Sequence, residues 1–191
     1  MQKTRAIYSG AISSFINGNH YKVIGNTEPV GICGSGIVDI IAYLLTEGCI
    51  NKTGLLKETF IIPRKNKIQV IQKDIREIQL AKSAIYSGII ILMKQAGLSF
   101  RDIEALYLAG GFGNYININS AIQIGLLPHE LKGKIFPVGN SAAIGALQYL
   151  KSVGFEKKIN EIVKNSKYIE LSYHEEFTTE YVLNMNFTLN N

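Results

Sequence analysis

The chain has 191 residues, of which 47% are hydrophobic and 18% charged, a composition that fits one folded domain over residues 1–191 and excludes a disordered chain. The net charge of +5 is scattered, and the densest basic cluster, Arg64, Lys65 and Lys67, has no interleaved aromatic residues, so we expect no nucleic-acid partner. The chain shows neither a leader pattern nor an apolar run of membrane-spanning length, so we expect a cytoplasmic protein without a membrane partner.

The first part of the chain predicts short strands followed by a helix. Alternating apolar residues at Thr4–Ser9 and His20–Ile24 predict strands, with a turn at 16–19 between them. A glycine-rich bend at 31–36 opens into a helix over 37–46, where apolar residues recur at helical spacing. Two further short strands are expected at 60–62 and 68–71, joined by a basic turn.

The rest of the chain alternates helices and strands, which indicates an α/β or mixed architecture. The longest helix is expected over 74–96, with one continuous apolar stripe. Beyond it the pattern predicts strands at 105–109, 134–138 and 168–172, helices at 120–124, 141–150 and 156–164, and an amphipathic segment at 174–185.

Gly34, Ser35 and Gly36 form the first candidate for ligand binding, at the start of the helix over 37–46. Free N–H groups and the helix dipole favour phosphate at such a place, and glycine allows close approach to the backbone. A glycine hinge that packs the helix on a sheet explains the same residues equally well. The pattern is not a Walker loop, because no Lys-Ser or Lys-Thr follows.

The second candidate follows the strand at 105–109 and consists of consecutive small and polar residues: Gly110, Gly111, Phe112, Gly113 and Asn114. A strand that ends in glycines suits a nucleotide lying across the backbone at its carboxyl end. A plain tight turn is the structural alternative. A dinucleotide fingerprint is disfavoured, because Ile116 occupies the place of the third glycine.

The third candidate is a polar stripe along the edge of the long helix. Its members stand at i, i+3, i+4 and i+7 and therefore share one face: Gln79, Lys82, Ser83 and Tyr86. Such side chains could donate hydrogen bonds to a ribose and pack on a base. The simpler alternative is that these residues form the solvated flank of an amphipathic helix.

Asn140 and Asp39 are weaker candidates. Asn140 enters the helix over 141–150 from a loop, and a binding role for it is a minority interpretation beside helix packing. Asp39 lies one turn into the first helix and could reach a phosphate-bound metal, although a solvated helix residue is the simpler interpretation. Cys33 and Cys49 match no zinc or iron–sulfur spacing, so we expect no metal ligands in this chain.

Taken in order, these segments resemble the C-terminal domain of reductive activators of corrinoid proteins. The resemblance covers residues 31–36 with Asp39, 72–82, 108–116, 125–128 and 139–142, and the closing 168–172 with Phe177 is similar too. It implies the α/β fold of actin-like (ribonuclease H-like) ATPases, with a mixed sheet flanked by helices, and mostly the second lobe of the two-lobed fold.

The resemblance also implies cofactors and partners. ATP or ADP with Mg would lie between the lobes, with its adenosine held by Gly110, Gly111 and the polar stripe of the long helix. An N-terminal ferredoxin-like domain would carry a two-iron, two-sulfur cluster, and ATP use would be coupled to the reduction of a cobalt(II) corrinoid to cobalt(I). The partner would be a corrinoid protein or a corrinoid-dependent methyltransferase. The resemblance does not decide whether the chain forms a homodimer.

The chain departs from the family pattern in two respects. It has no phosphate motif of Asp-x-Gly-Thr character and no cluster-binding cysteines, so we expect the first lobe and the ferredoxin-like domain to be absent from it. By itself it is then a doubtful enzyme, because phosphoryl chemistry relies on positioned charge and metal. Two alternatives remain, an activator of a 2-hydroxyacyl-CoA dehydratase and a docking module for a corrinoid or methyltransferase protein without nucleotide chemistry.

Overall fold

The computed structural model describes residues 9–62 and 67–187. The expected strand at Thr4–Ser9 and the basic residues Arg64 and Lys65 therefore lie outside the described residues, except for Ser9, which is in a turn. Among the described helices, none is long and apolar enough to cross a membrane.

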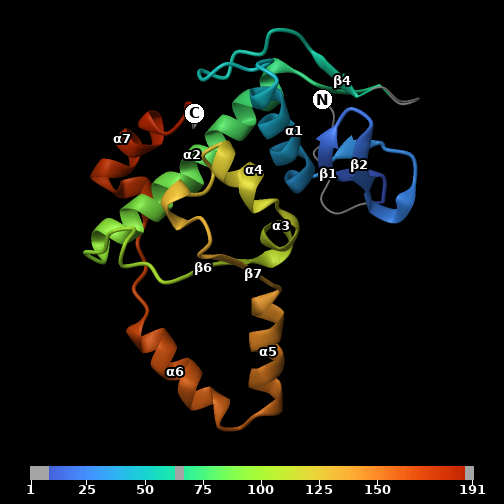
Figure 1. The fold of residues 1–191 in the computed structure, drawn as a ribbon. Coiled ribbons are helices and arrows are strands. Elements are labelled where there is room, and N and C mark those ends of the chain that lie inside the picture. Colours follow the sequence, from blue (N-terminus) through green and yellow to red (C-terminus); the bar gives the residue numbers. More distant parts are fainter. Residues whose placement is uncertain (1–8, 63–66, 188–191) are drawn as a thin grey trace.

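The N-terminal part is a small sheet covered by one helix (Figure 1). Strand β1 (Ala11–Asn17) pairs antiparallel with β2 (His20–Val23) and parallel with β3 (Gly31–Ile32), and a 3-10 turn, Ile24–Asn26, follows β2. Helix α1 (Gly34–Thr46) packs on β1 and buries most of its residues, because its apolar side chains recur at helical spacing.

A second layer is built around the long helix α2 (Gln72–Gln95). The antiparallel pair β4 (Phe60–Ile62) and β5 (Ile68–Val70) leads into it, and the carboxylate of Asp74 accepts a hydrogen bond from the Ile71 N–H at 2.9 Å. This bond satisfies one of the donors that a helix start leaves unpaired.

Next comes a two-stranded parallel sheet with two short helices between its strands. Strand β6 (Leu106–Ala109) is followed by α3 (Gly110–Tyr115), α4 (Ile118–Gln123), a 3-10 turn at His129–Leu131, and β7 (Ile135–Gly139). Helix α4 is fastened to α1, because Gln123 Nε2 donates to the Ala42 carbonyl at 3.0 Å.

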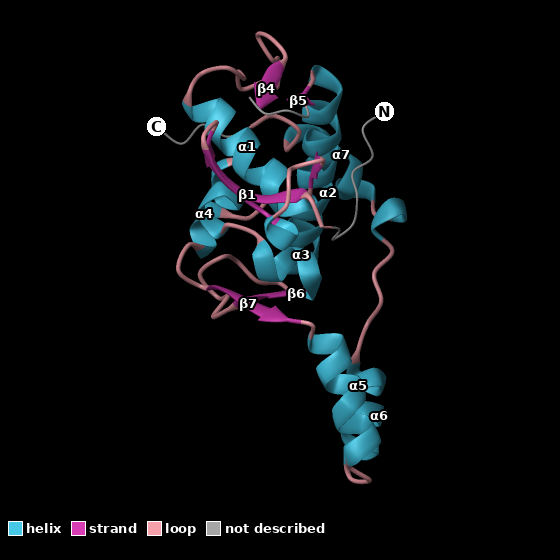
Figure 2. Ribbon diagram, turned by 90° about the vertical axis from the view of Figure 1, so that its right-hand side faces the viewer, coloured by secondary structure: helices cyan, strands magenta, loops and turns pink. Residues whose placement is uncertain are grey.

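The C-terminal part leaves the body and returns to it. Helices α5 (Ser141–Lys151) and α6 (Phe155–Asn165) form a hairpin that projects away from the rest, as Figures 1 and 2 show. A 3-10 turn at Leu171–Tyr173 and helix α7 (Glu175–Leu183) then bring the chain back along α2. The core is formed mainly by α1, the sheets beside it and the segment from α4 to β7.

Most predicted elements are confirmed, with boundary shifts of a few residues. The strand predicted at 168–172 is wrong: residues 171–173 form a 3-10 turn. Glu170 accepts hydrogen bonds from the Ser172 hydroxyl at 2.6 Å and from the Tyr168 hydroxyl, and such local side-chain bonds compete with a strand ladder. The first predicted turn is also shorter, because β1 extends to Asn17.

Candidate functional site

The carboxyl ends of β6 and β7 lie side by side. The parallel register pairs Ala109 with Gly139, so both strands end at one edge of the sheet. Helix α3 starts directly after β6, and α5 starts two residues after β7. In α/β proteins this edge of a parallel sheet is where ligands bind, so the second sequence candidate stands at a suitable place.

Gly110 and Gly111 leave the backbone open at this edge. Gly110 has φ +85°, and a Cβ added there would have no atom within 4 Å. Gly111 is exposed and has no positive φ, and Phe112 beside it is half-exposed. Gly113 differs, because a Cβ added there would lie 3.0 Å from Leu108 Cβ. The first two glycines thus leave room for a ligand, whereas the third is needed for packing.

The first glycine motif lies against the second. A Cβ added at Gly34 would come within 2.9 Å of the Phe112 ring, so the start of α1 is next to α3. Ser35 is buried and its hydroxyl donates to the Ser13 carbonyl at 2.6 Å, while a Cβ at Gly36 would lie 2.1 Å from the Ile12 carbonyl oxygen. Packing therefore accounts for Ser35 and Gly36, and Gly34 is the member that borders the glycines of α3.

Asn140 and Asn114 complete the edge. Asn140 caps α5, since its Oδ1 accepts from the Ala143 N–H at 3.0 Å. Asn114 Oδ1 lies 3.8 Å from where a Cβ of Gly139 would be, which brings α3 close to the end of β7. Residues from three sequence motifs that are far apart in the chain, Gly34, Gly110 and Asn140, are thus gathered around α3 and the ends of β6 and β7.

Asp39 is not a solvated helix residue, and that expectation is wrong. It is buried, and its Oδ2 accepts from the Phe15 N–H at 3.0 Å, which ties α1 to β1. Its Oδ1 has no hydrogen-bond partner among the described residues. Phe15 in turn packs edge-on against the rings of Tyr43 and Phe60, so Asp39 lies beside an aromatic cluster of the core.

The polar stripe of α2 shares one face, as its spacing predicts, and this face is covered by the C-terminal segment. Lys82 Nζ donates to the carbonyls of Asn184 and Asn186, each at 2.6 Å. Gln79 Nε2 donates to the carbonyls of Met185 at 3.0 Å and Thr53 at 3.2 Å. The hydroxyl of Ser83 donates to the carbonyl of Tyr181.

Burial changes the acid–base character of the stripe. Desolvation lowers the pKa of Lys82 from 10.5 to about 8, and the Phe187 ring centroid lies 5.5 Å from its Nζ. The pKa of Tyr86 is raised, first by desolvation and then by the charges of Glu130 and Glu180. Gln79, Lys82 and Ser83 form hydrogen bonds with α2 itself, with residue 53 and with residues 181–186. The role of these three side chains in adenosine binding therefore stays a prediction.

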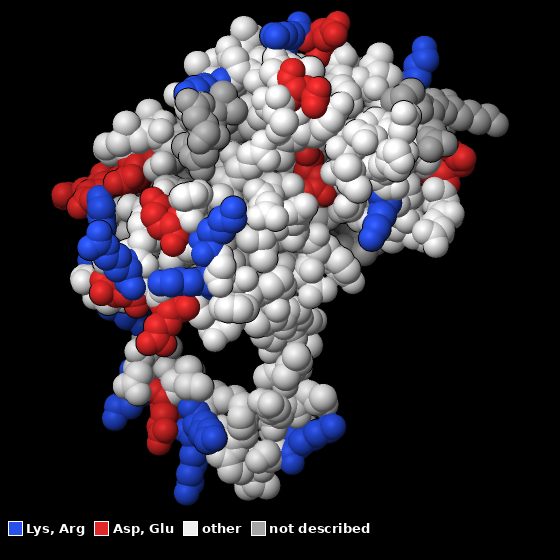
Figure 3. Space-filling model, in the orientation of Figure 1, with Lys and Arg blue, Asp and Glu red and all other residues white. Residues whose placement is uncertain are grey.

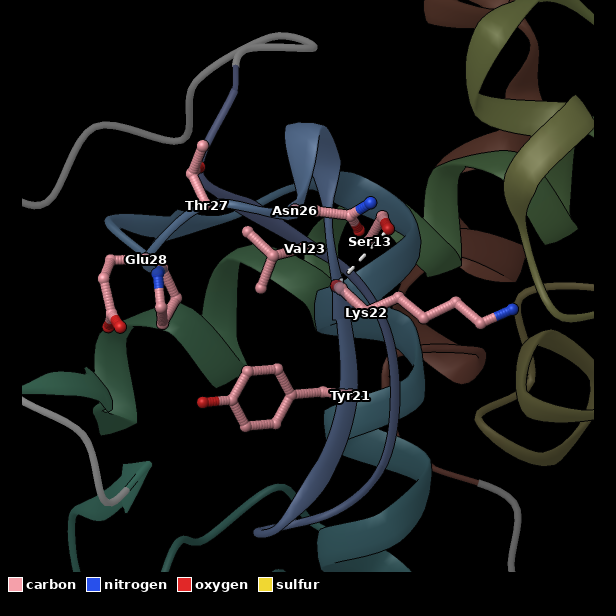
Figure 4. A pocket seen from close by; sticks show the side chains of 8 residues that line it. Ser13, Tyr21, Lys22, Val23, Asn26, Thr27 and Glu28 are labelled. Atoms are coloured by element: carbon pink, nitrogen blue, oxygen red, sulfur yellow. Dashed lines mark hydrogen bonds between the residues drawn. The ribbon is translucent and has the colours of Figure 1, made fainter.

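A pocket of about 590 Å³ opens elsewhere, beside the β1–β2 hairpin (Figure 4). Its lining residues are Ser13, Tyr21, Lys22, Val23, Asn26, Thr27, Glu28 and Pro29. Figure 4 shows the Lys22 amino group extending to the side opposite the Tyr21 hydroxyl and the Glu28 carboxylate, so the cationic group does not converge with them on one ligand position. No residue pattern in the chain predicted this pocket, because its lining residues belong to an ordinary hairpin and the loop after it.

The described residues contain no cluster of acidic, histidine or cysteine side chains that could hold an iron–sulfur cluster or a metal ion. No group of three or more His, Cys, Asp or Glu side chains gathers in the described part of the chain. Cys33 and Cys49 are free and partly buried, and two thiols cannot supply the four ligands of a cluster.

Comparison with known proteins identifies the family. Residues 3–191 match the model of the C-terminal domain of RACo, the ASKHA domain. The chain belongs to the RACo C-terminal domain family. The ASKHA fold is that of actin-like ATPases, so the family and the fold expected from the sequence are both confirmed.

Relatives of the family cover most of this chain. It is 37% identical over 194 residues to the corrinoid activation enzyme RamQ of Eubacterium limosum, covering 87% of this chain and 33% of that protein. It is 26% identical over 162 residues to the [Co(II) methylated amine-specific corrinoid protein] reductase of Methanosarcina barkeri, covering 84% and 30%.

A solved structure agrees with this assignment. The reductive activator for corrinoid, iron-sulfur protein superposes with a TM-score of 0.82 at 32% identity, covering 94% of this chain and 33% of that one. This chain thus spans about a third of the length of the family members it matches.

Proposed function

We propose that this chain is the ATP-binding C-terminal lobe of a reductive activator that returns cobalt(II) corrinoid proteins to cobalt(I). It acts together with a first lobe and an N-terminal ferredoxin-like domain that carries the iron–sulfur cluster. The names of all three relatives concern corrinoid proteins, which supports this function over activation of a 2-hydroxyacyl-CoA dehydratase. The partner is a corrinoid protein or a corrinoid-dependent methyltransferase, and the setting is cytoplasmic.

The observation that carries the proposal is the gathering of glycines at the ends of two parallel strands. Gly110, where a Cβ would meet no atom within 4 Å, and the exposed Gly111 lie at the carboxyl end of β6. Gly34 lies beside Phe112, and Asn140 lies at the end of β7. In this arrangement the adenosine lies across Gly110 and Gly111, and the start of α5 faces anionic groups of the nucleotide. Bound ATP supplies the driving force for electron transfer in the assembled protein.

Magnesium binding and hydrolysis need charged groups held together at the nucleotide, and no group of three or more His, Cys, Asp or Glu side chains gathers among the described residues. Asp39, the acidic residue nearest in sequence to Gly34, is buried against Phe15. The chain by itself therefore binds ATP or ADP weakly and does not hydrolyse ATP, because phosphoryl transfer requires positioned charge and metal.

A docking module without nucleotide chemistry is the second candidate, and one observation favours it. Three of the four residues of the α2 stripe are engaged by the chain's own C-terminal segment, which leaves fewer side chains to hold adenosine. The two functions differ in one measurable property, the saturable binding of nucleotide at the glycines of α3.

Calorimetric titration with ATP and ADP in the presence of Mg²⁺ tests the proposal. We expect weak, saturable binding that Gly111→Val abolishes, because the added side chain fills the open backbone next to Gly110. The fold should tolerate this change, since Gly111 is exposed and has no positive φ. Gly154→Val is the matched control. Gly154 lies at the tip of the α5–α6 hairpin, and a Cβ there would meet no atom within 4 Å.

The outcome separates the two candidates. Equal binding by the wild type and Gly111→Val would place the nucleotide elsewhere. No binding at millimolar nucleotide, in this chain and in a full-length family member alike, would favour the docking module.

A further inference from the structure

The ring of Phe112 occupies the space that a side chain at Gly34 would need. A Cβ added at Gly34 would lie 2.9 Å from Phe112 Cδ2 and 3.0 Å from Phe112 Cε2. The backbone of Gly34 does not itself require glycine, because its φ is not positive. The glycine at the start of α1 is therefore explained by the close approach of an aromatic ring from α3.

Phe112 carries the first side chain after the two glycines at the start of α3. Because Gly110 and Gly111 have no side chains, a ligand on their backbone can act on other elements only through neighbouring residues. Gly113 fixes the following part of α3 on β6, since a Cβ there would lie 3.0 Å from Leu108 Cβ. The ring of Phe112 contacts α1, but 44% of the residue remains exposed, so the core does not enclose it.

The contact between α1 and α3 is apolar. In Figure 3 the surface over α3 is formed by uncharged atoms, and the ion pairs found among the described residues involve Lys94, on α2. Attraction between packed apolar atoms falls steeply when a gap of about 0.5–1 Å opens between them. A small displacement of the Phe112 ring therefore weakens its contact with Gly34.

The start of α1 is in turn fastened to β1. The Ser35 hydroxyl donates to the Ser13 carbonyl at 2.6 Å. One turn later, the Asp39 carboxylate accepts from the Phe15 N–H at 3.0 Å. Ser35 and Asp39 are four residues apart and share one face of α1. A shift of the first turns of α1 therefore disturbs two backbone groups of β1.

We propose that Phe112 is a positioning residue that couples a nucleotide at Gly110 and Gly111 to α1 and, through α1, to β1. The inference rests on the proposed function, because the ligand on these glycines is the nucleotide. Bound nucleotide fixes the backbone of residues 110–112, which holds the ring on Gly34 and the first turns of α1 on β1. Without the ring, occupancy of the glycines no longer affects β1.

Amide exchange measured by NMR tests the contact without nucleotide. The reporters are the Ile37 N–H, which donates to the Cys33 carbonyl at 3.0 Å, and the Phe15 N–H. Relative to amides of α2, we expect both to exchange at least about threefold faster in Phe112→Ala. Tyr115→Ala removes a more exposed ring from the same helix and should leave both rates unchanged. Equal rates in the wild type and Phe112→Ala would overturn the proposal.

Gly34→Ala gives a second readout of the same contact. The added methyl group displaces the ring, so this change should also speed exchange at Ile37 in the otherwise unchanged chain. In a Phe112→Ala background it should cause no further increase, because the ring atoms that it displaces are absent. Additive effects would show that the two residues act separately and would overturn the proposal.

Repeating the exchange measurement with ADP separates coupling from packing. In the wild type, saturating ADP should slow exchange at Phe15 at least about threefold, whereas in Phe112→Ala saturating ADP should leave that rate unchanged. Phe112→Leu should restore the response, because leucine fills much of the same space.

Failure of the coupling and failure of the proposed function give different results. ADP binding with equal protection of Phe15 in the wild type and Phe112→Ala would overturn the coupling and leave the nucleotide site intact. Absence of ADP binding by the wild type in calorimetry would overturn the coupling in this chain together with the proposed site.

Discussion

Lys82 is a buried cation whose hydrogen-bond partners are main-chain carbonyls. It is 1% exposed, and its amino group reaches two carbonyls that follow α7. The last carbonyls of a helix lack intrahelical partners and carry the negative end of the helix dipole. A lysine has three donors and no acceptor, so it suits this position although its burial is costly.

The lowered pKa of Lys82 predicts a pH dependence of stability. Between about 8 and 10.5 the unfolded chain holds a proton that the folded chain has lost, so the folded state gains stability as the pH rises through this range. Urea unfolding of the wild type and of Lys82→Met at about pH 7 and about pH 9.5 checks this. We expect the wild type to gain about 2 kcal/mol relative to the variant between these two pH values. A stability difference that is the same at both pH values would mean that Lys82 does not titrate there.

Gly36 is required by the close approach of α1 to β1. A Cβ at this position would lie 2.1 Å from the Ile12 carbonyl oxygen, and backbone cannot move aside as a flexible side chain can. We expect Gly36→Ala to lower the free energy of unfolding by at least about 2 kcal/mol. Gly31→Ala is the control, because a Cβ there meets no atom within 4 Å. Chemical denaturation of both variants distinguishes a packing requirement from a general cost of replacing glycine.

At the scale of elements, α7 and the residues after it fasten the C-terminus to α2. Three side chains of α2 bond the carbonyls of residues 181–186, and Phe187 is 2% exposed in the core. The exposed ion pairs of Lys94 with Glu176 and Glu180 add little, because solvent and salt screen them. The anchor is therefore the buried segment and its aromatic residue.

Because of this anchor, we expect two alanine substitutions near the C-terminus to lower the free energy of unfolding by unequal amounts. Phe187→Ala should destabilise the chain by about 3–5 kcal/mol, because it leaves a cavity in the core. Val182→Ala should cost less than about 0.5 kcal/mol, since Val182 is exposed on α7. Thermal unfolding of both variants measures the difference. Equal effects would show that the segment is not anchored through Phe187.

The prediction of elements succeeded where the apolar pattern was long and failed where local side-chain bonds prevailed. The apolar stripe predicted a helix over 74–96, and α2 begins two residues earlier and ends one residue earlier. The segment at 168–172 has an alternating pattern too, but Glu170 accepts hydrogen bonds from Ser172, and no sheet of the described residues includes this segment. The glycines at 110–113 form the short helix α3, which a glycine-rich pattern does not predict.

At the scale of the whole molecule, stability is divided between a packed body and a projecting hairpin. Helices α1 and α2 bury residues along much of their length, whereas no residue of α5 or α6 is buried. Segments with few buried contacts open at low free-energy cost. In this chain alone we expect amides of the hairpin to exchange at least about a hundredfold faster than those of α1. Mass-spectrometric hydrogen exchange checks this, and equal rates would contradict it.

The residue pattern was enough to predict the family, the order of most helices and strands, and which residues share a face of α2. These properties are local: periodicity, glycine placement and ordered motifs are present in the chain without reference to distant contacts. It also placed Gly34, Gly110 and Asn140 among the candidates that the fold gathers around α3 and the ends of β6 and β7.

The partners of these helix faces could be identified only from the folded chain. Lys82 contacts Asn184, a residue 102 positions away, so the stripe proposed for adenosine binds the chain's own C-terminus. Asp39 became a buried acceptor for Phe15 because α1 packs on β1. Periodicity specifies a helix face or a strand edge, but the partner of that face or edge depends on the path of the whole chain.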